Sequence, residues 1–218
     1  MDGPRPGRDE QIAALRKKLE SFETVKAPLP VAEPVSVPDA LARLLPGGGL
    51  ARGAAYSLAP SALLTVELVA HASARGGVVG VIGWPELGLG GVVESGGQLD
   101  RIVVVPDPGL EPLMAVAVLV EGLDLVVYKG AARTLSPVAA RPLLAKLRGG
   151  RASLLMVGTQ VPSPAARIDA ELAAVEGIGA GTGRIRGLTL DVEVHAKGHH
   201  RRGEFVIGQA PQPRLRAV

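Results

Sequence analysis

Residues 45–80 constrain this chain most, because they have the strand, turn, helix and second strand that open a nucleotide-binding α/β domain. A Gly-rich entry leads into an apolar strand predicted over residues 54–58, and a helix is predicted over residues 62–75. The turn of such a unit wraps phosphates with the N–H groups of several glycines, and adds a Lys and a Ser or Thr. The turn here is Ala59-Pro60-Ser61, without Gly or Lys. The sequence therefore predicts the scaffold of a nucleotide site without its phosphate cradle.

Apolar runs alternate with helical patterns along the rest of the body, which indicates a mostly parallel sheet with helices on both faces. Residues 189–207 change character: apolar and polar residues alternate on both sides of a connection over residues 196–203, which predicts an antiparallel C-terminal hairpin. The predicted fold class is therefore α/β. The predicted strands are 78–82, 102–105, 123–128 and 152–157, and the predicted helices are 109–121, 137–148 and 165–175.

Composition narrows the class of protein further. The 218 residues include no cysteine, which excludes disulfides and thiolate chemistry and agrees with a reducing cytoplasm. The N-terminus lacks the apolar core of a signal peptide, and no apolar run approaches the roughly 20 residues of a membrane helix. We therefore expect a cytoplasmic protein, nucleoid-associated if it acts on DNA, with no membrane partner.

The N-terminal part is expected to be separate from the body. A helix predicted over residues 9–23 has one narrow apolar stripe, and the linker over residues 26–38 is rich in proline and extended. The stripe must pack on its own domain, on a second copy or on another protein, and the linker favours another protein or a second copy over its own domain. The predicted units are residues 1–38, a core over 39–208 and a basic tail over 209–218. The stripe consists of Ile12, Leu15, Leu19 and Phe22.

The C-terminal part is basic, although the net charge of the chain is only +3. This region is either a solvated tail or a contact for nucleic acid or another anion. The histidines at 195, 199 and 200 suggest a metal cluster, but few other ligands lie nearby in the sequence and Arg201-Arg202 would repel a cation, so we predict no metal. The candidate DNA or anion contacts are Lys197, His199, His200, Arg201 and Arg202.

Three residues lie at positions where a nucleotide-using α/β enzyme would have its catalytic and metal-binding residues. Glu86 follows the 78–82 strand and is either a general base or an exposed capping carboxylate. Lys129 ends the 123–128 strand, where an ATPase needs an acidic residue for its metal. Trp84 is either a surface anchor for a partner or a cover for the sheet edge. We therefore predict no catalytic residue, no cofactor and no metal.

The ordered set of segments over residues 39–208 resembles a diverged RecA-type core. Three departures from that family argue against ATP use: the shortened turn at 59–61, Lys129 in place of the metal-site Asp, and Glu193-Val194-His195 in place of a Lys-x-Lys pair. Glu86 stands in the place of the family's catalytic Glu. The segments that carry the resemblance are LPGGGLARGAAYSL, VGVIGWPELGL, LDRIVVVPDPGLEPL, GLDLVVYKGAARTLSP and HHRRGEFVIG.

Within the RecA-like group, the chain is similar to the ImuA-type proteins, particularly the actinobacterial ImuA-prime form. That resemblance implies a non-catalytic adaptor of SOS-induced, error-prone translesion DNA synthesis, a DNA repair function. The implied partners are an ImuB-like Y-family polymerase homologue, an error-prone C-family polymerase, RecA, DNA, and a second copy through the N-terminal helix. The alternatives are an ATP-dependent RecA-like recombinase or DNA-binding ATPase, and a SulA-like cell-division inhibitor.

Overall fold

The computed structural model describes residues 33–178 and 183–208. A separate unit begins at Pro34, and the account below concerns the described residues of this unit. The predicted N-terminal helix with Ile12, Leu15, Leu19 and Phe22, and the tail over 209–218, lie outside the described residues. The core domain starts at Pro34, before the predicted boundary at 39, because Val35 and Val37 are buried and Val35 pairs with Leu50.

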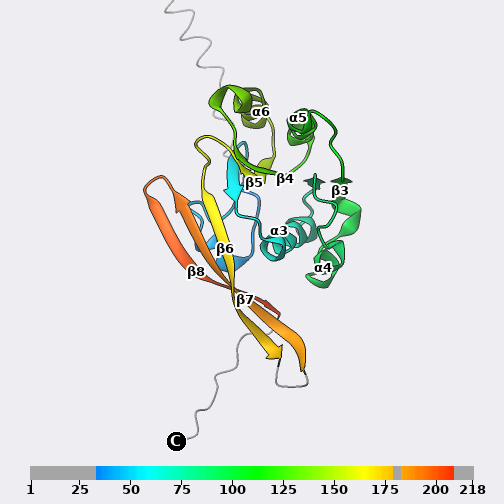
Figure 1. Ribbon diagram of the computed structural model, residues 1–218, viewed down its shortest axis with the longest axis vertical. Helices are drawn as coiled ribbons and strands as arrows, with labels where there is room; N and C mark the ends of the chain where they lie inside the picture. The colour runs from blue at the N-terminus through cyan, green and yellow to red at the C-terminus, as the bar shows by residue number, and fades with distance from the viewer. Residues whose placement is uncertain (1–32, 179–182, 209–218) are drawn as a thin grey trace, which may run out of the picture. The chain divides into compact units, whose positions relative to one another are not determined.

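One eight-stranded sheet organises this unit, in the order β3-β2-β4-β5-β1-β6-β7-β8 (Figure 1). Strands β1 to β6 pair in parallel, and β7 and β8 continue the sheet in antiparallel fashion. The predicted α/β fold class, a mostly parallel sheet with an antiparallel C-terminal hairpin, is confirmed by this arrangement. The strands are β1 Ala55–Leu58, β2 Val79–Ile82, β3 Ile102–Val105, β4 Leu125–Thr134, β5 Ser153–Gln160, β6 Arg167–Ile178, β7 Gly183–Ala196 and β8 His199–Gly208.

Helices cover both faces of the parallel part of the sheet, α3 and α4 on one face and α5 and α6 on the other (Figure 1). Side chains of the inner strands alternate between these layers. On β4, Leu125 and Val127 join the apolar cluster that contains α3, while Val126 and Tyr128 join the cluster that contains α5 and α6. The helices are α2 Asp39–Ala42, α3 Ala62–Ala74, α4 Leu89–Glu94, α5 Pro112–Gly122 and α6 Pro137–Gly149, with a 3₁₀ turn η1 Leu99–Arg101.

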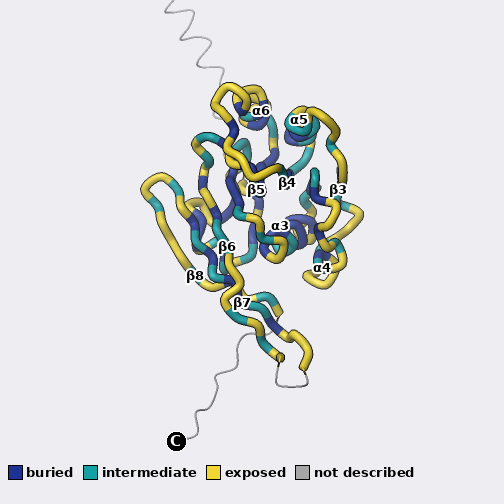
Figure 2. The backbone as a smooth tube through the Cα atoms, in the orientation of Figure 1, coloured by how far each residue is buried: buried dark blue, intermediate teal, exposed yellow. Residues whose placement is uncertain are grey.

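Strands β6 to β8 are covered on one face only within the described part of the chain. Their inward residues join the cluster around α2 and α3, and their outward residues are mostly charged and exposed (Figure 2). This is the alternation expected of antiparallel strands that face the core on one side and water on the other. The inward residues are Ile168, Leu190, Val192, Val194 and Phe205.

Two predictions about this region were wrong. Residues 165–175 were predicted as a helix but form most of β6, because pairing with β1 and β7 overrides the helix propensity of their Ala and Glu residues. The hairpin connection over 196–203 is shorter than predicted: Lys197-Gly198 forms the turn, with Gly198 at a φ of 68°. Consequently residues 199–202 lie in β8 and not in a loop.

No helix in the described ranges is long and apolar enough to span a membrane.

Candidate functional site

The turn between β1 and α3 closes tightly at the place where a phosphate loop would stand. The Ala59 N–H donates to the Ile168 carbonyl on β6 (2.9 Å), so it is not available to an anion. Ser61 caps α3, its Oγ accepting from the Leu64 N–H (3.4 Å). The cavity beside the turn has a volume of about 140 Å³. That is smaller than the roughly 300 Å³ at which small-molecule sites begin.

Lys129 lies within β4, one residue beyond Tyr128, the last residue that pairs with β2; the predicted 123–128 strand therefore does not end at Lys129 but continues to Thr134. The Lys129 Nζ lies 4.7 Å from the centroid of the Trp84 ring and 4.0 Å from Oε2 of Glu86. An ammonium over an indole face is held by the ring quadrupole as well as by the carboxylate. A cation supplied by the protein therefore occupies the space beside the one carboxylate that the RecA resemblance assigns to catalysis.

The two predicted residues next to Lys129 have different environments. The Glu86 side chain is 74% exposed and has the Lys129 ammonium as its charged neighbour. Trp84 is only 6% exposed and belongs to the apolar cluster around α3. Such burial contradicts Trp84 as a surface anchor for a partner and favours the alternative, in which it covers the sheet.

The open side of β6, β7 and β8, which we call the charged face, is the second candidate site. Residues on it lie directly opposite one another across the strands, and acidic groups predominate. Like charges in directly opposite positions are destabilising unless another charge compensates them. The three rows of the charged face are Arg167–His195–His200, Asp169–Glu193–Arg202 and Glu171–Asp191–Glu204.

Arg202 compensates one of these carboxylates. Its guanidinium donates to both oxygens of Asp191, including an Nε to Oδ1 bond of 2.8 Å. The hydrogen bond from Arg202 is the main cause that lowers the pKa of Asp191, and the Asp191 carboxylate in turn raises the pKa of Arg202. The pair is exposed, so it orients Arg202 more than it stabilises the fold.

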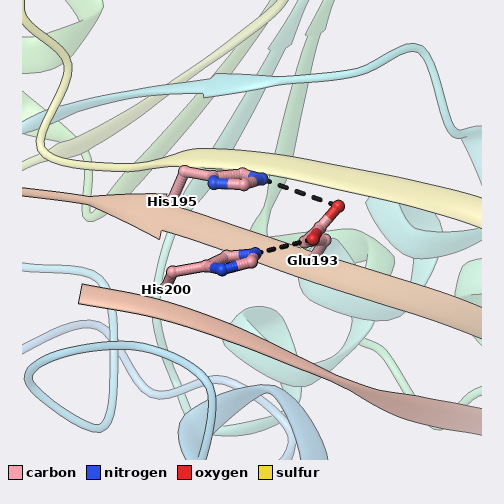
Figure 3. Close-up of side chains that lie close together, drawn as sticks. All are labelled: Glu193, His195 and His200. Atoms are coloured by element: carbon pink, nitrogen blue, oxygen red, sulfur yellow. Dashed lines mark hydrogen bonds and ion pairs between the residues drawn. The ribbon is translucent and has the colours of Figure 1, made fainter.

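Glu193, His195 and His200 form a compact cluster on the same face (Figure 3). Nε2 of His200 lies 2.6 Å from Oε1 of Glu193, and Nε2 of His195 lies 3.6 Å from Oε2. The two imidazoles stack with their centroids 4.3 Å apart and an angle of 11° between their planes. The pKa of Glu193 is lowered, first by the hydrogen bond from His200, although partial desolvation opposes the shift.

The structure does not assemble the predicted DNA or anion contacts into one basic patch. His199 and Arg201 point to the α2 side, where they bind the carbonyl oxygens of Leu44 (2.7 Å) and Arg43 (3.1 Å). His200 and Arg202 point to the charged face, where each meets a carboxylate. Lys197 is exposed at the turn. The alternation of side chains along a strand separates residues that look contiguous in the sequence.

Sequence reasoning missed the carboxylates of the charged face. Asp169 and Glu171 lie in the segment predicted as a helix, where a spacing of two places residues on different sides. Their spacing is the strand period, and it matches that of Asp191 and Glu193 on β7. The spacing of two between Asp169 and Glu171 was a signal for a strand. The sequence did not show that this segment pairs with β7, which brings its carboxylates opposite Asp191 and Glu193.

Comparisons with known proteins place the chain in a family. Residues 43–163 match the MT3502 N-terminal domain. The chain is 32% identical over 189 residues to the uncharacterized protein Rv3395c of Mycobacterium tuberculosis (strain ATCC 25618 / H37Rv), and the match covers 84% of this chain and 86% of that protein.

Similar solved structures include the RadB recombinase and the ATPase domain of another protein. The RadB recombinase has a TM-score of 0.47 at 13% identity, and the match covers 76% of this chain and 92% of that one. The ATPase domain has a TM-score of 0.49 at 10% identity, over 94% of this chain and 96% of that one. By its sequence match across residues 43–163, the chain belongs to the MT3502 N-terminal domain family.

Proposed function

We propose that this protein is a non-catalytic RecA-like adaptor of an error-prone translesion DNA synthesis complex, working with an ImuB-like protein and an error-prone C-family polymerase. The observation that carries the proposal is the Lys129 ammonium between Trp84 and Glu86, at the place where a RecA-type ATPase holds its metal. A RecA-like sheet is retained around a site that has lost the means to use ATP. Such a protein acts by binding other macromolecules with its surface.

The chemistry of the site supports the loss of ATP hydrolysis. Phosphoryl transfer needs Mg²⁺ held by carboxylate or hydroxyl oxygens and a cradle of N–H groups around the phosphates. An ammonium 4.0 Å from Glu86 repels a divalent cation there. The N–H of Ala59 is bonded within the sheet. The proposed loss of ATP hydrolysis therefore rests on two features: a cation beside Glu86 where Mg²⁺ would have to bind, and a backbone N–H at Ala59 that is already hydrogen-bonded.

Exposed apolar side chains support a protein partner. Met114 and Val118 on α5 are 55% and 61% exposed, and Leu110 in the preceding loop is fully exposed. Apolar groups that gather on a surface are commonly covered by another protein. We assign this surface of α5 to the ImuB-like partner.

Nucleotide binding is the first test. Calorimetric titration of the protein with ATP and Mg²⁺ is expected to give no heat of binding, and the nucleotide is expected to leave the melting temperature unchanged. A micromolar affinity for ATP would contradict the proposal. ATP hydrolysis stimulated by single-stranded DNA would favour the alternative of a recombinase or DNA-binding ATPase.

Co-purification from cells that express both this protein and the ImuB-like partner is the second test. The Met114→Glu and Val118→Glu double variant is expected to lose the partner while its thermal unfolding stays unchanged. Val93→Glu on α4 is the matched control, since Val93 is 51% exposed on a helix of the opposite sheet face. Absence of binding by the unaltered protein, together with filamentation of cells that express it, would favour the cell-division inhibitor.

A further inference from the structure

Three metal-ligating groups converge on the charged face, and the backbone holds them there. His195 on β7 and His200 on β8 are directly opposite in the antiparallel ladder, and Glu193 is two residues from His195 on the same side of β7. Their ligand atoms all lie within 4.8 Å of one another. Figure 3 shows both rings turned toward the Glu193 carboxylate. The arrangement depends on strand register and not on loops, so the fold fixes the backbone positions of the three donor residues before any ligand arrives.

The charge around this cluster favours a cation. Asp169 on β6 lies directly opposite Glu193, and Glu171 lies directly opposite Asp191. The hydrogen bonds of Arg202 go to Asp191, so the repulsion between the facing carboxylates of Asp169 and Glu193 is offset by the imidazoles at Glu193 and by the nearby charge of Arg202, but not by a hydrogen bond from Arg202. A cation bound at Glu193 would relieve this repulsion.

The arginines nearby do not oppose a cation as the sequence suggested. Arg201 points to the other side of the sheet and donates to the Arg43 carbonyl. Arg202 is held by Asp191, and Arg167 donates to Oε1 of Gln160 (3.0 Å). Each of these guanidinium groups is directed at an oxygen of its own outside the cluster. The fold therefore turns Arg201 away from the cluster, while Arg202 stays opposite Glu193 with its charge compensated by Asp191.

We propose that Glu193, His195 and His200 bind a divalent transition metal of the zinc type. Two imidazole nitrogens and one carboxylate oxygen form a donor set that suits Zn²⁺, Co²⁺, Ni²⁺ or Cu²⁺ better than Mg²⁺ or Ca²⁺, which prefer oxygen alone. Binding needs side-chain rotation, because nitrogen and oxygen ligands must approach to roughly 2.0–2.2 Å from the metal. The metal replaces the hydrogen bond between His200 and Glu193.

The site is open to solvent. The side chains of Glu193, His195 and His200 are 36%, 47% and 59% exposed. With three protein ligands, a tetrahedral ion keeps a fourth position for water or for a group from another molecule. This inference is independent of the proposed adaptor function, because it uses neither the Lys129 site between Trp84 and Glu86 nor α5.

Titration of the full-length protein with Zn²⁺ in a calorimeter, and with Co²⁺ in a visible spectrophotometer, tests the site. We expect one equivalent to bind and the Co²⁺ absorption bands to appear, with no response to Mg²⁺. His195→Ala and His200→Ala should each weaken Zn²⁺ binding by at least about tenfold, since even loss of an outer partner of a metal ligand costs that much.

His199→Ala is the matched control, because His199 lies on the same strand as His200 but binds the Leu44 carbonyl on the other side of the sheet. It should leave the Zn²⁺ affinity unchanged. Each variant without metal should unfold at the same temperature as the unaltered protein, because the cluster is exposed and its side chains are not part of the core. This measurement separates loss of binding from loss of the fold. Two results would overturn the site: no Zn²⁺ binding by the unaltered protein, or an equal loss of affinity in His199→Ala and in the cluster variants.

Discussion

Asp124 shows how a single carboxylate ties together the amino-terminal edge of the sheet. Its side chain is 19% exposed and accepts from the Val78 N–H (3.0 Å) and from Nη1 of Arg52 (2.8 Å). Burial tends to raise the pKa of Asp124, but these hydrogen bonds and the charges of Arg52 and Arg151 outweigh it, and the pKa is lowered.

Asp124→Asn is expected to reduce the free energy of unfolding at pH 7 by about 1–3 kcal/mol, because Arg52 and Arg151 lose a charged partner and the NH₂ group of Asn cannot replace the second acceptor oxygen. A lowered carboxyl pKa stabilises the fold above the unfolded value of about 3.9, and this stability is lost as the pH falls through the lower, folded pKa. Urea denaturation at pH 7 and at pH 3 should therefore show a deficit in the variant that shrinks in acid. An equal deficit at both pH values would exclude the ionised carboxylate as its cause.

Gly83 is required where β2 ends and the chain turns toward Trp84. Its φ is 69°, and an added Cβ would lie 2.7 Å from the Lys129 carbonyl oxygen. Gly83→Ala is expected to cost about 1–3 kcal/mol of stability through backbone strain and this clash. Gly90→Ala on α4 is the control, because a Cβ there meets no atom within 4 Å. Thermal unfolding should separate the two variants, and equal melting temperatures would refute the requirement.

At the scale of elements, the C-terminal hairpin is part of the core and not an appendage. Leu190 on β7 is 1% exposed and belongs to the same apolar cluster as α2 and α3. Leu190→Ala is expected to cost about 2–5 kcal/mol, with one unfolding transition for the whole unit. Ile185→Ala on the same strand is the control, since Ile185 is 55% exposed. Separate unfolding of the hairpin, seen by circular dichroism and fluorescence as two transitions, would contradict this.

At the scale of the whole molecule, residues 34–218 form a compact unit with its own apolar clusters on both sides of the sheet. A chain that lacks residues 1–33 is therefore expected to melt within a few degrees of the full-length protein. If the stripe of Ile12, Leu15, Leu19 and Phe22 binds the ImuB-like partner, the shortened chain should keep its fold and lose co-purification. A large fall in melting temperature would show instead that the N-terminal part stabilises the body.

The sequence by itself determined the βα units and showed that the turn after the first strand contains neither Gly nor Lys. The predicted strand over 102–105 has the observed bounds, and those over 78–82 and 54–58 are each one residue longer than observed. The strands β1 and β2 are predictable because a strand buried on both faces must be continuously apolar. The edge strand β3 is partly exposed, but its run of β-branched residues favours a strand. The Ala59-Pro60-Ser61 turn and Lys129 are local features that need no partner to be recognised.

Only the tertiary structure determined that β6 is a strand, where the hairpin turns, and which residues form the charged face. Residues 165–175 have helix-forming composition, and the neighbouring strands β1 and β7 make them a strand. Register then places His200 opposite His195, and strand alternation sends His199 and Arg201 to the other side. Which side chains meet across a sheet depends on the register between strands that are distant in sequence, and a local sequence pattern does not determine that register.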